Sequence, residues 1–426
     1  MGGEPIQALL GDYVSFRNGK SSPERCPNFP FKVYGSNGII GCSDQHNAPE
    51  KCFVIGRVGS YCGSVHYSEE LCWVSDNAII GEAKKTQESE FWYFMLKKLK
   101  LNNYRGGSGQ PLLNQTTLRS IPVEIPKESV IRERIGKIGF TLNQKIHLNH
   151  QTNRTLEAMA QALFKSWFVD FDPVIDNALA AGKAIPEPLQ AKAQRRQHVR
   201  NNPDLPKLPK DIQNLFPDEF EWTEAMGWVP RGWGVSDIGS EFDVTMGQSP
   251  PGHTYNEAGD GTPFFQGRAD FAFRFPNNRM YCTEPKRMAR RNDTLVSVRA
   301  PVGDVNMANK DCCIGRGLSA VRHRSGSSTY TFYSMLQLSE HFKVFESEGT
   351  VFGSINQKDF KGLPNLKVDP LVLKIFDELA GPKDYQIELS SHEIVSLTNL
   401  RDTLLPKLIS GELSIPDAEM QLKEVV

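Results

Sequence analysis

The residues with the clearest chemical potential in this chain are Gly19, Lys20 and Ser21, which spell the ending of a phosphate-binding P-loop. A P-loop also needs a glycine five residues before the first of these, because its backbone amides must enclose the phosphates. Val14 occupies that position, and a related string at residues 247–249 has glutamine in place of the lysine. The chain also lacks the Asn/Asp-Pro-Pro-Tyr/Phe string of amino-methyl transfer. We therefore assign neither ATP binding nor methylation to it.

Cysteine is the next residue type that could do chemistry. Eight cysteines occur, and Cys42, Cys52, Cys62 and Cys72 fall ten residues apart. Zinc sites need closely paired ligands, and the chain has no Cys-x-x-Cys pair and no His-x-x-x-His string. We expect reduced thiols, mostly buried at strand or turn positions, as is usual for free cysteine. The spacing indicates no metal site.

Basic side chains offer a binding function instead. The densest cluster is KRMARR at residues 286–291, and Arg268, Arg274 and Arg279 precede it, so that together they could form a phosphate-binding face. The alternative is an ordinary solvated surface. The formal net charge of -1 decides neither way, because any attraction to nucleic acid must come from local patches.

An internal repeat organises these residues. Residues 107–126 (GSGQPLLNQTTLRSIPVEIP) and 349–368 (GTVFGSINQKDFKGLPNLKV) share an Asn-Gln pair and a following Leu/Ile-Pro in register. Asn114 and Asn356 are 242 residues apart. Asparagine before a short helical turn is a good N-cap, and we interpret both as structural.

The same displacement of 242 residues relates Arg57 to Arg299, each of which follows an apolar strand and precedes a glycine turn. A guanidinium suits guanine edges and phosphate oxygens alike, whereas the structural alternative is an ion pair inside each repeat. A position shared by two divergent domains favours phosphate contact over base reading. Aromatic-rich segments at 90–101 and 329–342 predict one helix packed on a sheet in each half.

Helical periodicity follows each repeat. Ile135, Leu142, Leu156 and Leu163 share one seven-residue frame with Asn149 at its centre. The neighbouring seam of the same helix contains Ile131, Ile138 and Met159. A similar apolar stripe in the second half of the chain contains Ile387, Ile394, Leu397, Leu404 and Leu408. We expect these stripes to pack on one another, as a spacer of about 57 Å at about 1.5 Å per residue. Gly381 and Pro382 predict a kink or a late start of the second helix.

The segment between the two repeats and the segment at the end of the chain differ in composition from the rest. Residues 173–233 are rich in Pro, Asn, Lys and Arg, which predicts an extended connector with little core, anchored by Phe216, Phe220, Trp222, Trp228 and Trp233. The tail after Leu413 is polar, and we expect it to fray. No apolar run approaches the roughly 20 residues that span a bilayer, so we expect a cytoplasmic protein.

These strings jointly resemble one family, the specificity subunits of type I restriction-modification enzymes, called HsdS. The resemblance covers nearly the whole chain. It is carried by the paired entry strings GKSSP (19–23) and GQSPP (247–251), the two Asn-Gln blocks, and the strings ALFKSWFVDFDPV (162–174), LFPDEFEWTEAMGWVPRGW (215–233) and LRDTLLPKLISGEL (400–413). Each string is a modest signal, and their order together is highly specific.

The resemblance implies two α/β target-recognition domains in tandem, separated by two long antiparallel helices that form a coiled-coil spacer. Each domain would read one half of a bipartite DNA site, and because the heads have diverged we expect an asymmetric site. The expected parts are a first recognition domain at 1–128, a spacer helix at 129–172, the connector at 173–233, a second recognition domain at 234–368, a second spacer helix at 369–412 and the tail at 413–426.

The resemblance also implies partners. Two methyltransferase subunits (HsdM) would bind S-adenosylmethionine and methylate adenine, and motor-nuclease subunits (HsdR) would use ATP and Mg to translocate and cleave double-stranded DNA. This chain would bind no cofactor and catalyse nothing, in the cytoplasm of a bacterium or archaeon. A scaffold that assembles proteins without reading DNA is the rival class. An unrecognised enzyme is favoured least, because no acid/base, nucleophile or metal constellation clusters.

Given this resemblance, we favour DNA contact for the basic run. The candidate DNA-binding residues in the first head are Lys20, Ser21, Ser22, Arg57, Tyr61 and Arg105, near the loop at 106–110. Those in the second head are Gln248, Ser249, Gln266, Arg268, Lys286, Arg287, Arg290, Arg291 and Arg299. At the spacer ends we expect Trp167, Phe168, Phe171, Leu404 and Leu408 to contribute both to coiled-coil caps and to partner interfaces.

Overall fold

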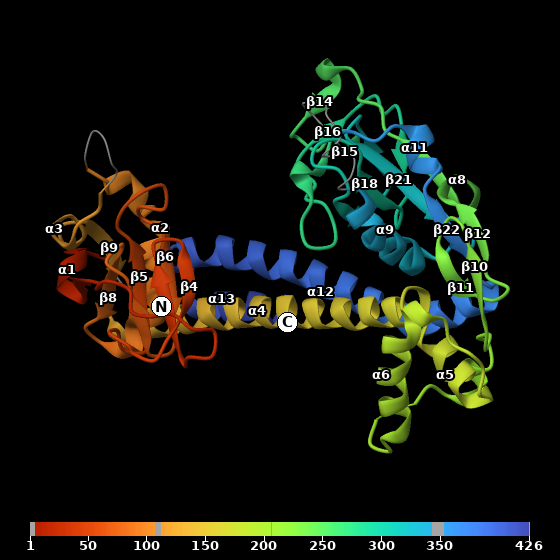
Figure 1. Ribbon diagram of the computed structural model, residues 1–426. Helices are drawn as coiled ribbons and strands as arrows, with labels where there is room; N and C mark the ends of the chain where they lie inside the picture. Colours follow the sequence, from red (N-terminus) through yellow and green to blue (C-terminus); the bar gives the residue numbers. More distant parts are fainter. Residues whose placement is uncertain (1–4, 107–111, 206, 343–352, 426) are drawn as a thin grey trace. The chain divides into compact units, whose positions relative to one another are not determined.

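The chain divides into two units, one formed by residues 1–152 with 389–426 and the other by residues 153–388. The structure, a computed structural model, describes residues 5–106, 112–205, 207–342 and 353–425 (Figure 1). Each unit contains one α/β head. Two long helices, α4 (Ser129–Phe168) and α12 (Pro370–Ser410), contribute residues to both units. The expected class of two α/β domains separated by long helices is therefore confirmed.

The first head is built on a four-stranded antiparallel sheet in the order β2-β8-β5-β6. Apolar residues alternate along its edge strand, so that Val14 and Phe16 are buried, whereas the central strand β5 is buried throughout. The strands and helices are β1 (Pro5–Leu9), α1 (Leu10–Tyr13), β2 (Val14–Asn18), β3 (Phe31–Gly35), β4 (Gly38–Ser43), β5 (Cys52–Gly56), β6 (Val65–Ser68), β7 (Cys72–Val74), β8 (Ala78–Ala83), α2 (Ser89–Lys98), α3 (Gln115–Arg119) and β9 (Pro122–Pro126).

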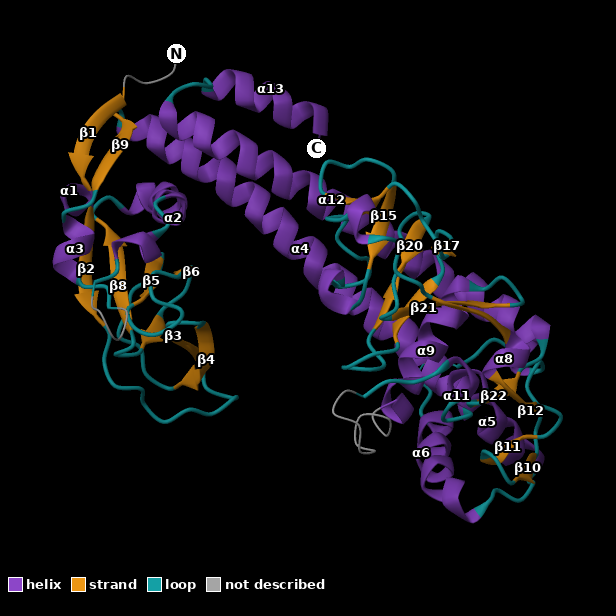
Figure 2. Ribbon diagram, turned by 90° about the horizontal axis from the view of Figure 1, so that it is seen from above, coloured by secondary structure: helices purple, strands orange, loops and turns teal. Residues whose placement is uncertain are grey.

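The second head repeats this arrangement (Figure 2). Its four-stranded antiparallel sheet has the order β13-β21-β18-β19, and a second sheet has the order β14-β16-β15-β20-β17. The elements are β12 (Gly234–Asp237), α8 (Ile238–Glu241), β13 (Phe242–Met246), β14 (Tyr255–Asn256), β15 (Thr262–Phe265), β16 (Tyr281–Cys282), β17 (Met288–Ala289), β18 (Thr294–Ser297), β19 (Val305–Met307), β20 (Cys312–Ile314), β21 (Leu318–His323), α9 (Ser328–Phe342), α11 (Gln357–Lys361) and β22 (Pro364–Lys367).

Smaller pairings confirm that the heads are duplicates. Antiparallel β1 and β9 correspond to β12 and β22, and the parallel pair β3 and β7 corresponds to β15 and β20. The side chain of Asn114 accepts a hydrogen bond of 2.8 Å from the amide of Thr117, and that of Asn356 accepts one of 3.0 Å from Asp359. Both asparagines are the expected N-caps, of α3 and α11.

The long helices pack antiparallel within each unit. In the first unit, Arg401 of α12 donates to Asn143 of α4 at 2.7 Å, and Asn149 of α4 donates to Glu393 of α12 at 2.8 Å. As the residue number rises along one helix it falls along the other. In the second unit, the rings of Phe164 and Phe376 lie 5.9 Å apart. The predicted apolar stripes meet, with the buried Asn149 hydrogen-bonded between them.

Two glycines of α4 let the first head dock closely on it. A Cβ atom at Gly136 would lie 2.5 Å from the backbone nitrogen of Phe91, and one at Gly139 would lie 2.6 Å from the ring of Phe94. Both phenylalanines belong to α2. The apolar stripe expected in the second long helix packs at the same place. Its residues Leu404 and Leu408 are buried in the same core cluster as α2.

The interruption expected in α12 is absent, because the helix begins at Pro370 and continues through Gly381 and Pro382 to Ser410. Proline at the first helical position forfeits no hydrogen bond, and the Asp369 carboxylate accepts from the amide of Leu371 at 2.7 Å. Near the internal proline, the ammonium of Lys383 donates to the carbonyl of Leu379 at 2.6 Å. The prediction of a late start is wrong. In α4, Met159 lies off the expected seam and is exposed.

The connector is also not extended. It contains α5 (Asp172–Ala181), α6 (Gln190–Asn201), α7 (Lys210–Gln213), and the hairpin β10 (Phe220–Thr223) and β11 (Gly227–Pro230). Val174, Ile175 and Ala178 form the buried face of α5, and an ion pair joins Arg196 of α6 to Asp176. The basic and proline-rich composition led to a wrong prediction. Polar residues make up most of these short helices, and only a few apolar residues form their buried faces. Of the expected anchors, Phe216 and Trp233 are buried.

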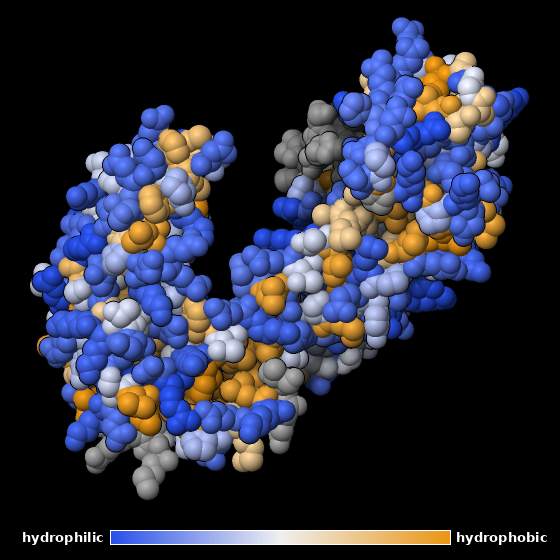
Figure 3. Space-filling model, turned by 90° about the horizontal axis from the view of Figure 1, so that it is seen from below, coloured by the Kyte–Doolittle hydropathy of each residue, from blue (hydrophilic) through white to orange (hydrophobic). Residues whose placement is uncertain are grey.

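The polar tail is helical as well. Helix α13 (Ile415–Val425) buries Ile415 and Ala418 in the core cluster of the first head, and Glu419 pairs with Arg134 of α4 at 2.7 Å. The expectation of fraying is therefore wrong for residues 415–425. Hydrophilic side chains cover most of the face in view in Figure 3, with hydrophobic side chains in smaller groups. Within the described ranges, no helix combines the length and apolar character needed to cross a membrane.

Candidate nucleic-acid interface

The entry loops of the two heads begin at equivalent glycines. A Cβ atom would lie 2.0 Å from the carbonyl oxygen of Ser75 at Gly19, and 2.1 Å from that of Gly315 at Gly247. Only glycine fits such close backbone contact. The amides that follow, of Lys20 and Gln248, donate to Val74 and Ile314 at 3.1 and 3.0 Å. Both loops are therefore held by the same backbone device, while their side chains differ.

The predicted readers in these loops are accessible. Lys20, Ser21, Ser22 and Gln248 are exposed, and Ser249 is half-buried, where its hydroxyl accepts from the amide of Arg316 at 3.3 Å. A lysine in one head and a glutamine in the other present different hydrogen-bonding groups from the same place. This is the kind of difference that would distinguish two base sequences.

Arg57 and Arg299 occupy matched positions, as the repeat predicts. The amide of Leu113 donates to the carbonyl of Arg57 at 2.9 Å, and the amide of Ile355 donates to the carbonyl of Val298 at 3.1 Å. In each head, an equivalent segment is thus hydrogen-bonded to the backbone that follows the strand. Arg299 is exposed and Arg57 half-buried, with a buried Nε atom that has no partner among the described residues. The structural alternative, an ion pair within the repeat, is found for neither arginine in the described ranges.

The remaining candidates of the first head lie on its surface. Tyr61 is 50% exposed in the loop between β5 and β6, and Arg105 is exposed just before Gly106. Most of the predicted flexible loop at 106–110 lies outside the described residues, which resume at Leu112. Tyr61 and Arg105 are therefore accessible to a ligand.

The basic run lies at an edge of the second head. Lys286, Arg287 and Arg290 are exposed around β17, the last strand of its five-stranded sheet. Arg291 is different, because it pairs with Glu388 of α12, and this hydrogen-bonded partner raises the pKa of Arg291. Three of the four candidates in the run therefore have no ion pair among the described residues, whereas Arg291 is engaged.

Other candidates of this head lie in the loop after β15. Gln266 is exposed, and its carbonyl accepts from Gly317 at 3.0 Å. Arg268 is half exposed and forms an ion pair with Asp304. Exposed Arg279 pairs with Asp270 at 3.2 Å and with Glu257 at 3.3 Å. Asp270 is buried, but both arginines and their partners Asp304 and Glu257 are exposed to water, so phosphates can compete for both arginines.

Arg274, expected on the same phosphate-binding face, is instead buried. Its side chain is 1% exposed, and its Nη2 atom lies 3.3 Å from Glu157 of α4 and 3.1 Å from Asp384 of α12. The same nitrogen donates to the hydroxyl of Tyr333 at 2.9 Å. The prediction of phosphate contact is wrong, because the guanidinium itself is buried and is bound by side chains of the same unit.

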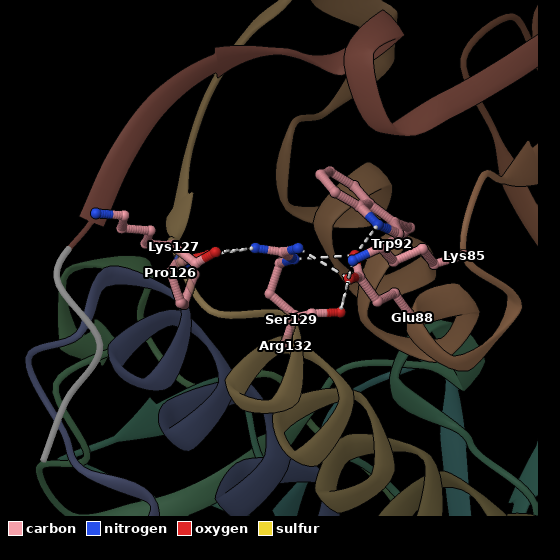
Figure 4. Close-up of polar contacts among 7 residues, drawn as sticks. All are labelled: Lys85, Glu88, Trp92, Pro126, Lys127, Ser129 and Arg132. Atoms are coloured by element: carbon pink, nitrogen blue, oxygen red, sulfur yellow. Dashed lines mark hydrogen bonds and ion pairs between the residues drawn. The ribbon is translucent and has the colours of Figure 1, made fainter.

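A second buried ion pair, not foreseen from the sequence, lies in the first unit (Figure 4). Arg132 of α4 donates to both carboxylate oxygens of Glu88, at 2.9 and 2.8 Å, and Trp92 and Ser129 donate to the same carboxylate. Burial opposes the charge of Glu88, but the donors outweigh it and hold its pKa below the usual value. The available signal was a charged residue, Arg132, between Ile131 and Ile135 on the apolar face.

The five residues predicted for partner interfaces are buried within their own units. Trp167, Phe168 and Phe171 pack with the aromatic residues of the second head, and Leu404 and Leu408 with those of the first. An interface needs exposed side chains, so the prediction of direct partner contact is wrong for these residues. Aromatic and aliphatic side chains at a helix end serve a core and an interface equally well, and here they complete the two head cores.

The described residues contain no group of three His, Cys, Asp or Glu side chains placed to hold a metal ion. All eight cysteines are free, and six of them are buried, as expected. The notable geometry is thus a pair of duplicated heads whose exposed loops differ, each fastened to long helices by a buried arginine.

Comparison with known proteins finds similarity to one family. The profile described as Type I restriction modification DNA specificity domain matches residues 10–158. A Methanocaldococcus jannaschii protein, described as the specificity subunit of type I restriction enzyme MjaX, is 33% identical over 201 residues, 45% of each protein. The HindI specificity subunit of Haemophilus influenzae is 28% identical over 342 residues, 71% of each. This chain therefore spans less than half of the first relative and more than two thirds of the second.

The fold is similar to a solved one. The S subunit of a type I restriction-modification system from M. genitalium superposes with a TM-score of 0.63 over 96% of each chain, at 13% sequence identity. Residues 10–158 thus match a type I restriction-modification DNA specificity domain, and the chain is similar to specificity subunits of such systems. Both relatives are described as specificity subunits.

Proposed function

We propose that each head of this chain reads one half of a bipartite, asymmetric site in double-stranded DNA. The observation that carries this proposal is the strand-for-strand duplication of the heads combined with different side chains on equivalent loops. In two-fold symmetric dimers, paired heads read the two halves of a palindrome. Two unlike heads in one chain would read two unlike half-sites.

The contacts divide into two kinds. Arg57 and Arg299, shared by both heads, bind phosphates and set the position of each head on the duplex. Lys286, Arg287 and Arg290 add phosphate contacts in the second head, because they are exposed and have no ion pair among the described residues. Base edges are read by the side chains that differ between heads: Lys20, Ser21, Ser22, Tyr61 and Arg105 in the first, and Gln248, Ser249, Gln266 and Arg268 in the second.

The long helices set the gap between the half-sites. A helix of 40 residues, the length of α4, extends about 60 Å at about 1.5 Å per residue. Their antiparallel contacts and the polar pairs in their middle support a register that does not slip. The gap would then be a property of the helices and the half-sites a property of the heads.

The chemistry belongs to partner subunits. Two methyltransferase subunits, carrying S-adenosylmethionine, bind near the equivalent ends of the helices and flip a target adenine out of each half-site. Motor-nuclease subunits, using ATP and Mg, join the same complex. Since the aromatic residues at the helix ends are buried, these partners must contact other, exposed residues.

Selection from a pool of randomised duplexes, with the full chain co-expressed with its methyltransferase partner, tests the proposal. Bound duplexes should be enriched in two short conserved blocks of different sequence at a constant separation. Enrichment of a single continuous block would contradict the two-head assignment. No enrichment at all would indicate a scaffold that assembles proteins without reading DNA.

A further inference from the structure

Arg274 lies in the loop after η5 (Arg268–Asp270) in the second head, yet its guanidinium reaches both long helices. One nitrogen contacts Glu157 of α4 at 3.3 Å and Asp384 of α12 at 3.1 Å. The guanidinium also lies 3.8 Å from the ring centre of Phe332 in α9. One side chain thus joins a surface loop to three helices.

The backbone of this loop is fastened to the sheet at the same point. The amide of Met307 in β19 donates to the carbonyl of Arg274 at 2.9 Å, and the side chain of Asn306 donates to the carbonyl of Ala272 at 2.9 Å. The neighbouring Phe273 faces outward and is 39% exposed. Both hydrogen bonds are accepted by backbone carbonyls, so another side chain at position 274 would leave them in place.

The charges around Arg274 argue for positioning rather than stability. Two carboxylates face one guanidinium in a buried site, and Nε and Nη1 of Arg274 and one oxygen of Asp384 have no partner among the described residues. Apolar residues in place of a buried ion pair are often equally or more stable. What the charged group adds is direction, because a guanidinium fork accepts few geometries.

We propose that Arg274 is a positioning residue for recognition of the second half-site. It holds the loop from 266 to 279, which carries the candidate readers Gln266 and Arg268, in one orientation relative to α4 and α12. The inference rests on the proposed function and adds to it: what the second head reads depends on a tie to the helices. The first head has a buried pair too, but Glu88 and Arg132 join α4 to the start of α2 and not to a reading loop.

The test compares three versions of the full chain, each co-expressed with the methyltransferase partner. The first is wild type, the second Arg274→Met with Glu157→Gln and Asp384→Asn, and the third Glu88→Gln with Arg132→Met. Removing all three charges together avoids leaving an unpaired buried charge. Duplex pools are randomised in one half-site at a time. We expect the triple variant to lose about tenfold of its base preference in the second half-site only, and the matched control to keep both preferences.

A purely structural role would lower the melting temperature without changing base preference, so unchanged selection by the folded triple variant would overturn the inference. If that variant does not fold, Arg274→Lys takes its place, because an ammonium keeps the charge but lacks the fork that reaches several acceptors. The same loss is expected for it, and retained preference would overturn the inference. A wild-type chain that selects no second half-site would instead refute the proposed function.

Discussion

The guanidinium of Arg132 meets the carboxylate of Glu88 in two hydrogen bonds of 2.9 and 2.8 Å, where the two side chains are only 3% and 2% exposed. The pair joins a long helix to the first head at the point where α2 begins. Paired buried charges contribute little net stability, but an unpaired one is costly. Changing only one partner of this pair should therefore destabilise the first unit more than changing both.

Glu88→Gln should destabilise the first unit by about 3–5 kcal/mol, because Arg132 would stay buried without its counter-charge. Combining it with Arg132→Met should recover part of this loss, since no charge then remains, although the carbonyls of Pro126 and Lys127 lose a donor. Urea unfolding of the full chain measures both variants. A single variant as stable as wild type would show that the pair is not desolvated as described.

Gly136→Ala should also destabilise the first unit, by about 1–3 kcal/mol, because the added methyl group would press on the backbone of Phe91 and push α2 away from α4. Gly381→Ala is the matched control in the other long helix. Among the described residues outside its own helix, the hydroxyl oxygen of Thr329, 3.9 Å away, is the one atom near its added methyl group, so this variant should be neutral or gain up to about 1 kcal/mol of stability. Equal effects at the two glycines would contradict the packing.

The second unit should respond to pH through Glu157. Burial raises the pKa of Glu157, Arg274 opposes this, and Asp384 adds to it. Because the folded-state pKa is raised, the folded protein holds the proton more tightly than the unfolded chain. The stabilisation is full below the usual glutamate pKa and is lost as pH rises through the folded-state value.

Melting temperatures of wild type and Glu157→Gln over this pH range measure that contribution. The melting temperature of wild type, relative to that of Glu157→Gln, should fall as pH rises, because glutamine does not titrate. A difference independent of pH would mean that Glu157 titrates as it does in the unfolded chain.

The basic run should act mainly through phosphates. Replacing Lys286, Arg287 and Arg290 by alanine should weaken binding to all duplexes alike and lower the slope of log K against log salt by about 1 for each phosphate that is no longer neutralised. Arg291→Ala is the matched comparison, because Arg291 already forms an ion pair with Glu388. Filter binding at several salt concentrations measures the slopes. A change in base preference with an unchanged slope would assign these residues to base reading instead.

Much of the fold follows from sequence, because the repeat and the heptads are patterns along the chain. The matched Asn114 and Asn356 predicted two N-caps, and the stripes through Ile135 and Leu404 predicted the helix pair. The site followed less well. Arg274 lies among basic, polar and aromatic residues typical of a surface loop, and only the tertiary structure brings Glu157 and Asp384 to it.

Two other predictions failed for a related reason. The connector and the tail are polar in composition, but short helices such as α5 and α13 need only a few apolar residues to bury one face. Trp167 and Leu408 were ambiguous, because a core and an interface select the same residue types. Composition cannot separate these cases, since the deciding quantity is what covers the side chain.

The most direct test of the account is the pattern of adenine methylation in the genome of cells that carry the complete system. It should be compared for wild type and for a variant with one heptad inserted into each of α4 and α12. Wild type should methylate a site with two unlike halves. The insertion should leave both halves unchanged and widen the gap by about 10 Å, or about three base pairs. Altered half-sites, or one continuous methylated sequence in wild type, would contradict the separation of reading heads from spacing helices.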